Sequence, residues 1–392
     1  MSHVEPPEAL PHGLMSHLEG AVAAGVCSAA ALGIVLAEGR RHVGWSGRLH
    51  AWRGPEGPNG WQPDPGPPLV ASSLWDLASL TKPMAVTTLV CRELGRPDGP
   101  LQLDRPLGEL LADARPQALA GATLAQLLGH ASGAPAWRDF YAQTAALAAR
   151  PTARAAEIRR LVLATALQQP AGQRAEYSDL GFMALGWALE ATLGAPLDAL
   201  FAERVAGPLG LRQSGFRRLG QPLSPADVCA TEVWPSRCPD GLPLRGEVHD
   251  DNCAGLHGVA GHAGLFASLG DVLTWAEAWL RAARGDESGL LAPRAVGALI
   301  GQSAAPSTTW RLGWDTASAA GSSAGAGVSP SAFGHLGFTG TSVWIDPARG
   351  AAAVLLTNRV HPSREPHAPI KALRPVVHGA IWRWLAAVRS NR

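Results

Sequence analysis

The chain has 392 residues, a net charge of +1, 45 glycines and 32 prolines, with 46% hydrophobic and 17% charged residues. This composition is typical of a globular protein and excludes a disordered or fibrous one, and a chain of this length usually forms two domains. The near-neutral charge, without any dense run of Lys or Arg, argues against nucleic acid as a partner.

The N-terminal region lacks the features of an export signal. The first twenty residues contain Glu5, Glu8 and Glu19 and no Lys or Arg, so the apolar stretch 21–37 has no basic flank. The same stretch is short for a membrane span. We therefore expect a cytoplasmic protein with no membrane partner, and the sequence carries no signal for its oligomeric state.

The five cysteines are odd in number, which argues against both a disulfide framework and a zinc ribbon. We expect reduced thiols. They are widely spaced and include no CxxC pair: Cys27, Cys91, Cys229, Cys238 and Cys253.

The N-terminal quarter predicts a hairpin, a loop and a helix. Residues 29–37 are apolar with β-branched members, Glu38-Gly39 forms a turn, and 42–47 continues as a second strand. Residues 53–68 are dense in Pro and Gly and predict a loop. Residues 77–94 carry apolar side chains at helical spacing and predict a helix.

The middle of the chain favours helices. Residues 112–209 are rich in Ala and Leu with few β-branched runs, which predicts several helices joined by short loops. Residues 213–251 are punctuated by proline and predict irregular structure. Residues 270–284 predict an amphipathic helix.

The C-terminal part returns to strands. Residues 316–331 consist almost entirely of Ala, Ser and Gly and predict a flexible surface loop. A second hairpin is predicted from strands 341–345 and 351–356 around the turn 346–350. Residues 368–388 predict a closing helix.

Strands at both ends with helices between them predict an α/β domain formed by both termini with a helical insert. We assign residues 1–95 and 255–392 to the α/β domain and residues 96–254 to the mostly helical insert.

Ser79 and Lys82 are the first candidates for chemistry. At the start of a helix, a spacing of three stacks the hydroxyl and the amine on one face. A desolvated lysine can take the proton of a serine, and the helix N-terminus offers N–H groups to an oxyanion. Lys82 and Lys371 are the only lysines in a chain rich in Arg. A lysine retained in that background suggests a site that needs an amine able to lose its proton, which Arg cannot do.

Tyr177-Ser178-Asp179 precedes an apolar helical run and supplies a second set of polar groups. A phenol beside a lysine could relay protons. The structural alternative is that Tyr177 packs at a helix start whose cap is Ser178 or Asp179.

His335-Leu336-Gly337 leads into the second predicted hairpin. The small Gly337 would let a substrate backbone approach, and the Phe338 N–H could point at an oxyanion. His262 has a glycine at the same spacing, but a predicted helix follows it, so we prefer His335.

Two further patterns suggest other chemistry less strongly. The segment 321–325 fits the G-x-S-x-G esterase elbow, but it lies in a low-complexity stretch rather than between a strand and a helix. A second group could suggest a metal, although its spacing fits no zinc signature, and a loop beside the active site is the better interpretation. Its members are His249, Asp250, Asp251, Cys253, His257 and His262.

The order Ser-x-x-Lys, Tyr-x-Asp and His-x-Gly resembles the motifs of the serine β-lactamase and penicillin-binding protein superfamily. The resemblance spans about residues 27–356 and is nearest the branch of class C β-lactamases and related carboxylesterases. Five segments carry it: DLASLTKP (76–83), LLGHASGAPAW (127–137), YSDLGFMALG (177–186), GVAGHAGLFAS (258–268) and GHLGFTGTSVWIDP (334–347).

The resemblance implies an α+β fold, with an antiparallel sheet flanked by helices and an all-helical domain. It implies that Ser79 is the nucleophile of an acyl-enzyme and that Lys82 and Tyr177 share the general-base and general-acid roles. The oxyanion hole would consist of the N–H groups of Ser79 and Phe338. Asp179, His335 and Gly337 would line the substrate pocket, with no metal or organic cofactor.

Three positions depart from the lactamase pattern: Asp179 replaces Asn, His335 replaces Lys, and Leu336 replaces Thr or Ser. In that family the Lys and the hydroxyl help to hold a substrate carboxylate, and Leu336 cannot donate a hydrogen bond. His335, Thr339 and Thr341 could compensate for this loss.

We therefore expect a serine hydrolase that cleaves small carboxylic esters or related amides. The first alternative is a D-alanyl-D-alanine carboxypeptidase or β-lactamase activity on peptidoglycan fragments or β-lactams. The second is a non-catalytic penicillin-binding sensor, which the intact Ser79, Lys82 and Tyr177 argue against.

Overall fold

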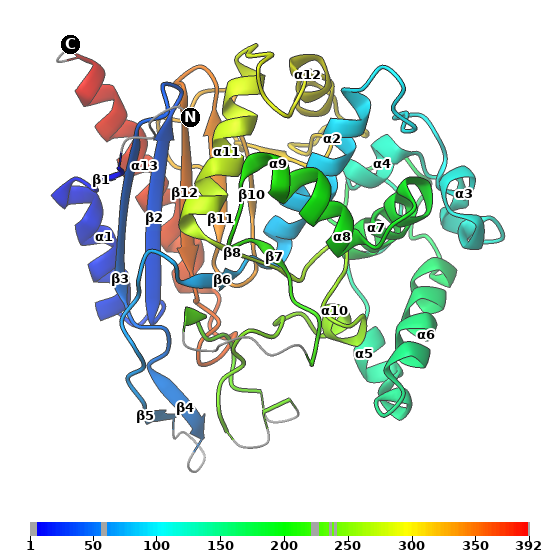
Figure 1. The fold of residues 1–392 in the computed structure, drawn as a ribbon, viewed down its shortest axis with the longest axis horizontal. Helices are drawn as coiled ribbons and strands as arrows, with labels where there is room; N and C mark the ends of the chain where they lie inside the picture. Colours follow the sequence, from blue (N-terminus) through cyan, green and yellow to red (C-terminus); the bar gives the residue numbers. More distant parts are fainter. Residues whose placement is uncertain (1–5, 56–60, 221–226, 235–236, 239–240, 391–392) are drawn as a thin grey trace.

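The computed structural model describes residues 6–55, 61–220, 227–234, 237–238 and 241–390. A seven-stranded sheet with helices on both faces forms one side of the molecule, and a group of further helices forms the other (Figure 1). Neighbouring strands of this sheet are antiparallel except for the pair of β1 and β3. Their order is β1 (Glu8–Ala9), β3 (Arg41–Gly47), β2 (Ala29–Leu36), β12 (Ala351–Thr357), β11 (Ser342–Asp346), β10 (Phe333–Leu336) and β9 (Asp315–Thr316).

The centre of the sheet joins the two ends of the chain. β2 pairs with β12, so that Leu32 lies opposite Leu355. Every residue of both strands is buried. Because helices cover both faces there, β2 is a continuous apolar run instead of an alternation of apolar and polar residues.

Three helices cover the faces of the sheet. α11 (Leu269–Ala283) packs on one face, and α1 (His12–Ala23) and α13 (Ala368–Ser390) pack on the other. A Cβ added at Gly33 of β2 would lie 2.6 Å from Cδ1 of Leu273. This glycine therefore allows the close approach of α11 to the centre of the sheet.

Two smaller sheets were not predicted. β4 (Trp52–Pro55) pairs with β5 (Trp61–Pro63) inside the segment 53–68, which was predicted to be a loop and whose residues 56–60 lie outside the described residues. In the second sheet β8 (Leu265–Ser268) lies between β6 (Leu74–Asp76) and β7 (Gly215–Phe216). Strands of two to four residues are too short to produce a recognisable period of apolar residues.

The predicted helix 77–94 is confirmed as a 3₁₀ turn at Ala78–Leu80, a π-helical stretch at Lys82–Thr87 and α2 (Thr88–Leu94). The middle of the chain is helical as predicted. Its helices are α3 (Leu107–Leu110), α4 (Leu124–Leu128), α5 (Phe140–Gln143), α6 (Pro151–Ala164), α7 (Asp179–Leu193), α8 (Leu197–Phe201) and α9 (Gly207–Leu209), followed later by α10 (Asp251–Gly255) and α12 (Pro293–Gly301).

Both predicted hairpins, the amphipathic helix and the closing helix are confirmed as β2–β3, β11–β12, α11 and α13. The segment 213–251 is irregular apart from β7, and its residues 221–226, 235–236 and 239–240 lie outside the described residues. The prediction of a surface loop at 316–331 is wrong at Ala324. This residue is fully buried, and its carbonyl oxygen accepts a hydrogen bond from Trp382 of α13 (2.7 Å).

The five cysteines are buried free thiols, as expected. The division into two domains stays a prediction, since one hydrophobic cluster contains residues from the sheet and from the middle helices alike.

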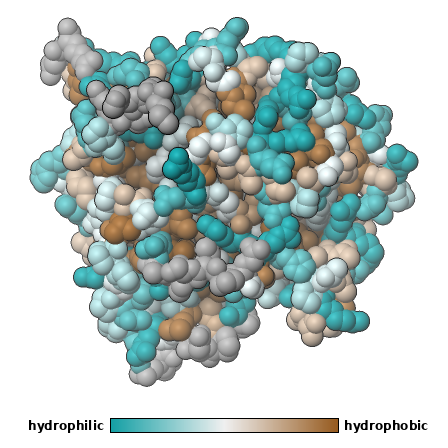
Figure 2. All heavy atoms as spheres, in the orientation of Figure 1, coloured by the Kyte–Doolittle hydropathy of each residue, from teal (hydrophilic) through white to brown (hydrophobic). Residues whose placement is uncertain are grey.

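Among the described residues no single helix is long and apolar enough to cross a membrane. One bent pair of helical segments, α7 with 197–209, meets the length and composition expected of a membrane span, and no other feature of the described residues supports that interpretation. Hydrophilic residues cover much of the face in Figure 2, with apolar residues between them.

Candidate active site

Ser79 lies in a tight turn between β6 and α2 that the carboxylate of Asp76 holds. Ala78 has a φ of 47°, which residues other than glycine rarely adopt. Asp76 accepts hydrogen bonds from the N–H of Ala78 (2.8 Å, Oδ1) and of His249 (2.7 Å, Oδ2). Burial raises the pKa of Asp76, and the two N–H donors act in the opposite direction. Asp76 thus stabilises an unusual backbone turn at Ser79 and connects it to the loop before α10.

The structure brings Lys82 to Ser79, as the spacing of three residues predicts. Lys82 is fully buried, and its Nζ donates to Oγ of Ser79 (3.0 Å) and to Oδ1 of Asp179 (2.6 Å). A third contact goes to the carbonyl oxygen of His262 (3.3 Å). Pro83 lies in the first helical turn, where its missing N–H costs no helical hydrogen bond.

Charge in this cluster is set by burial and by the Asp179 carboxylate. Burial alone would lower the pKa of Lys82, but Asp179 and the Tyr177 hydroxyl outweigh it, and the pKa is raised. Burial raises the pKa of Tyr177 too, against the effect of the Lys82 cation. At neutral pH the resting site therefore holds a lysine cation beside an aspartate and an uncharged phenol. Lys82 or Tyr177 would have to lose a proton before it could accept a proton from the Ser79 hydroxyl.

Tyr177 is placed by contacts from two other segments. Its hydroxyl interacts with the side chains of Lys82 and Ser79. The ring of His130 lies 4.6 Å from that of Tyr177 and 4.5 Å from that of Trp310, measured between centroids. Together these contacts hold the phenol against the Ser79 and Lys82 side chains.

The backbone around Tyr177 is fixed at the start of α7. Nδ1 of His130 accepts a hydrogen bond from the backbone N–H of Ser178 (3.1 Å). This requires an unprotonated nitrogen, in agreement with burial, which lowers the pKa of His130 well below its usual value. Ser178 caps α7 by accepting the N–H of Gly181 (3.2 Å), so the capping role considered for Ser178 is present. Asp179, the first residue of α7, then follows in a fixed position beside Lys82.

His335 presents an uncharged acceptor to the pocket. Its Nδ1 lies 2.8 Å from the carbonyl oxygen of Leu336, which can only accept, so Nδ1 carries the hydrogen and Nε2 the lone pair. Burial, with a contribution from the Lys82 cation, lowers the pKa of His335 to about 3. Nε2 is buried and has no hydrogen-bond partner among the described residues. A lysine in this place would instead present a cation.

The turn from Gly337 to Thr341 packs directly on the turn that carries Ser79. The hydroxyl of Thr341 donates to the carbonyl oxygen of Leu77 (3.0 Å), and that of Thr339 donates to the carbonyl oxygen of Asp76 (2.7 Å). Both threonines are buried. The suggestion that they compensate for Leu336 in carboxylate binding is therefore wrong, because their hydroxyl hydrogens already serve the protein's own backbone.

Gly337 is required by this packing. A Cβ at this position would lie 2.0 Å from Oγ1 of Thr341 and 2.5 Å from the carbonyl oxygen of Leu77. Gly337 lines the cavity, and the approach of a substrate to it stays a prediction. A further reason for a glycine is that the space is needed for contact between two turns of the protein itself.

The amide N–H groups of Ser79 and Phe338 are the two donors predicted for an oxyanion. Among the described residues neither N–H donates a hydrogen bond to another protein group. Each belongs to one of the two turns that the threonine hydroxyls hold together. Free donors fixed in this way can stabilise a developing negative charge without reorganising.

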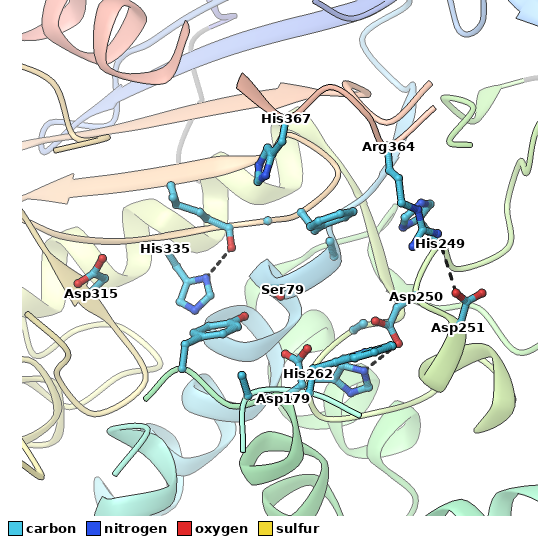
Figure 3. A pocket seen from close by; sticks show the side chains of 18 of the residues that line it. Ser79, Asp179, His249, Asp250, Asp251, His262, Asp315, His335, Arg364 and His367 are labelled. Atoms are coloured by element: carbon cyan, nitrogen blue, oxygen red, sulfur yellow. Dashed lines mark hydrogen bonds and ion pairs between the residues drawn. The ribbon is translucent and has the colours of Figure 1, made fainter. Parts of the chain in front are cut away.

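These residues surround a cavity of about 530 Å³ (Figure 3). In Figure 3, Ser79 lies near the middle, with His335 and Asp315 on one side and Asp250 and His262 on the other. His262 and His335 both line the cavity; His335, the preferred candidate, lies on strand β10, whereas His262 lies in a turn before β8. The remaining lining includes Tyr177, Asp179, His249, Asp251, Trp137, Trp310, Leu336, Gly337, Phe338, Arg364, His367 and Arg374.

Part of the histidine and aspartate segment borders the cavity, as its interpretation as a loop beside the site predicts. Asp250 pairs with Nε2 of His262 (2.9 Å), and His249 pairs with Glu232 (2.9 Å). Cys253 and His257 are not among the lining residues. Within the described chain, no three His, Cys, Asp or Glu side chains are arranged to hold a metal ion.

The G-x-S-x-G pattern at 321–325 has no place in this site. It lies between strands β9 and β10 and contributes nothing to the lining of the cavity. An esterase elbow requires a strand before it and a helix after it.

Sequence reasoning missed three residues that shape the site: Asp76, His130 and Arg374. Asp76 and His130 fall within segments that carried the family resemblance, which was the available signal for them. Arg374 comes from the final helix, where no spacing relates it to Ser79.

Comparison with known proteins agrees with this geometry. The family model described as Beta-lactamase matches residues 21–375. A protein of Escherichia coli K12 named "Putative D-alanyl-D-alanine carboxypeptidase" is 30% identical over 316 residues, which cover 76% of this chain and 70% of that protein.

Similar solved structures share the fold at low identity. EstCE1, described as a hydrolase with promiscuous acyltransferase activity, has a TM-score of 0.67 at 21% identity, covering 94% of this chain and 97% of its own. Simvastatin synthase (LovD) from Aspergillus terreus has a TM-score of 0.68 at 18% identity, covering 95% and 97%. The family match over most of the chain settles the classification: this protein belongs to the β-lactamase family and is a serine hydrolase of α+β fold.

Proposed function

We propose that the protein hydrolyses small carboxylic esters or related amides through an acyl-enzyme on Ser79. One observation carries the proposal: Lys82 lies 3.0 Å from the Ser79 hydroxyl beside two free N–H groups in a cavity large enough for a small substrate. A nucleophile, a proton-transfer pair and an oxyanion hole in one pocket are the parts that acyl transfer requires.

In the proposed reaction, Oγ of Ser79 bonds to the substrate carbonyl carbon as its proton passes to the Lys82 and Tyr177 pair. The carbonyl oxygen takes the negative charge and accepts hydrogen bonds from the N–H groups of Ser79 and Phe338. When the carbonyl reforms, the bond to the leaving alcohol or amine breaks, and the pair returns the proton to it. Water then attacks the acyl-enzyme and is deprotonated in the same way, which releases the acid and restores Ser79.

Ester cleavage is favoured over cleavage of substrates that end in a carboxylate. His335 is neutral and offers a lone pair, and Leu336 has no hydroxyl. Arg364 lines the cavity, but its guanidinium pairs with Glu232 at 2.6 Å. A carboxylate placed at His335 would lack a donor, which is costly in a buried site.

The second candidate is a D-alanyl-D-alanine carboxypeptidase or β-lactamase activity. The name of the Escherichia coli relative supports it. In this case the substrate carboxylate would need a partner other than His335, and among the described lining residues Arg374 is the cation without a carboxylate partner.

The test is the intact-protein mass of the wild type and of Ser79→Ala after incubation with a p-nitrophenyl ester, with nitrocefin and with benzylpenicillin, while product release is followed. We expect ester turnover that Ser79→Ala reduces by several powers of ten with the fold intact. Turnover near the wild-type rate in Ser79→Ala would refute the acyl-enzyme. A β-lactam adduct that disappears in Ser79→Ala would favour the second candidate.

A further inference from the structure

Two buried arginine side chains hold the turn that carries the Phe338 N–H. Arg374 of α13 donates from Nη2 to the carbonyl oxygens of Gly337 (2.7 Å) and Thr341 (2.9 Å). Arg359, which follows β12, donates from Nε to the carbonyl oxygen of Phe338 (2.7 Å). Its guanidinium lies 4.2 Å from the centroid of the Phe338 ring. A guanidinium therefore fixes each of the two peptide groups that flank Phe338.

The contact of Arg374 with Gly337 determines where the Phe338 N–H points. The carbonyl of Gly337 and the N–H of Phe338 belong to one planar trans peptide, in which the two bonds point in nearly opposite directions. When Arg374 holds the oxygen, the N–H is directed away from the arginine. Hydrogen bonding to a cation also polarises the peptide, which makes its N–H a stronger donor.

In the described part of the chain the charge of Arg374 is not paired with a carboxylate, whereas that of Arg359 is partly offset by Glu365 and Glu232. Arg359 and Arg374 are each only 4% exposed, and in the described residues neither lies within salt-bridge distance of a carboxylate. Burial lowers the pKa of Arg374 to about 9 and that of Arg359 to about 10, so both remain cations at neutral pH. A buried cation without an ion-pair partner is destabilising, and a negative charge that forms nearby reduces this cost.

We propose that Arg374 is a positioning residue of the oxyanion hole, which acts through the Gly337–Phe338 peptide and is assisted by Arg359. The two cations aim the Phe338 N–H, and a negative charge that forms on the substrate oxygen offsets their charge further. Such an interaction is stronger in the transition state than in the bound substrate, so it lowers the barrier more than it tightens binding. This inference rests on the function proposed above.

A rival role for Arg374 is direct binding of a substrate carboxylate, because the residue also lines the cavity. The two roles predict different kinetics. A carboxylate ligand affects KM and affects only substrates with a carboxylate. A positioning residue affects kcat for neutral and anionic substrates alike.

The experiment measures kcat and KM of Arg374→Met and Arg374→Lys with p-nitrophenyl butyrate and with mono-p-nitrophenyl succinate. We expect Arg374→Met to lower kcat about 10- to 100-fold for both esters, since complete removal of an oxyanion donor costs about 100- to 1000-fold. KM should stay within about threefold of the wild type. Arg374→Lys, which keeps the charge but not the fork of donors, should give an intermediate kcat.

Arg383→Met is the matched control, because Arg383 is an exposed residue of the same helix. It should leave both parameters unchanged. If Arg374→Met does not fold, as judged by its thermal unfolding, Arg359→Met and guanidinium rescue of Arg374→Ala replace it. We expect added guanidinium to restore kcat of Arg374→Ala with little change in KM.

Two results would overturn the inference: an unchanged kcat in Arg374→Met, or a rise in KM confined to the succinate ester. Failure of the proposed function is visible separately, as absence of ester turnover in the wild type. The rate at which a fluorophosphonate labels Ser79 then provides the test, since this reagent also places an oxygen in the oxyanion hole. Equal labelling rates in the wild type and Arg374→Met would contradict the inference.

Discussion

Gly337→Ala should damage stability and catalysis together. The added Cβ would lie 2.0 Å from Oγ1 of Thr341 and 2.5 Å from the carbonyl oxygen of Leu77, and the second of these is a backbone atom that cannot rotate away. Overpacking of this kind costs about 1–3 kcal/mol of unfolding free energy. Loss of the hydrogen bond from Thr341 to Leu77 adds about 0.5–1.5 kcal/mol. We expect a total destabilisation of about 1.5–4.5 kcal/mol.

Catalysis should fall because the same clash separates the two turns that carry the proposed oxyanion donors. A displacement of about 1 Å at a reacting centre costs about 100-fold in rate, so kcat for a neutral ester should fall by about that factor. The assays are urea unfolding and steady-state ester hydrolysis. Gly297→Ala on α12 is the control, since a Cβ there meets nothing within 4 Å.

The same experiment separates packing between the turns from the approach of a substrate. If Gly337 served only to admit a substrate, Gly337→Ala would raise KM and leave the unfolding free energy at the wild-type value. That outcome would refute the packing explanation. Thr341→Ala in the Gly337→Ala background removes the closest contact and should recover part of the lost stability.

Two further predictions concern the charges at Lys82. In Asp179→Asn the carboxylate that raises the pKa of Lys82 is gone, so the pH above which kcat/KM reaches its plateau should move to lower pH. The control Asp315→Asn removes another carboxylate of the cavity and should leave that pH unchanged. An unmoved pH profile in Asp179→Asn would show that Lys82 is not the titrating base. Lys82→Arg keeps a cation that cannot lose its proton, so ester turnover should fall by about 100- to 10,000-fold, and near-normal turnover would show that Lys82 acts only as a charge.

Long periodic elements could be predicted from the sequence. The helix that contains Lys82, the hairpin of β11 and β12, and α13 follow from apolar spacing and turn residues. The proximity of Ser79 to Lys82 also follows from helical geometry, because the two residues are one turn apart. These are local features, which a short window of sequence determines.

Contacts between distant segments could not be predicted. Nothing in the neighbourhood of Thr339 indicates that its hydroxyl donates to Asp76, or that Arg374 holds the Gly337 carbonyl. The spacing of His335 and Gly337 located a turn that lines the cavity, but the packing of Gly337 against Thr341 and Leu77 could not be predicted because its neighbours in space were unknown. Charge states such as that of His335 depend on burial, which composition does not reveal.

The pairing of β2 with β12 also bears on when activity appears during synthesis. A nascent chain that has emerged as far as β9 already contains Ser79, Lys82 and Tyr177, but it lacks the strands and the helix that supply Phe338 and Arg374. The central strand pair closes only when residues near the C-terminus leave the ribosome. An incompletely translated or C-terminally clipped chain would therefore carry Ser79 without the Phe338 N–H and without Arg374, and we expect it to be inactive.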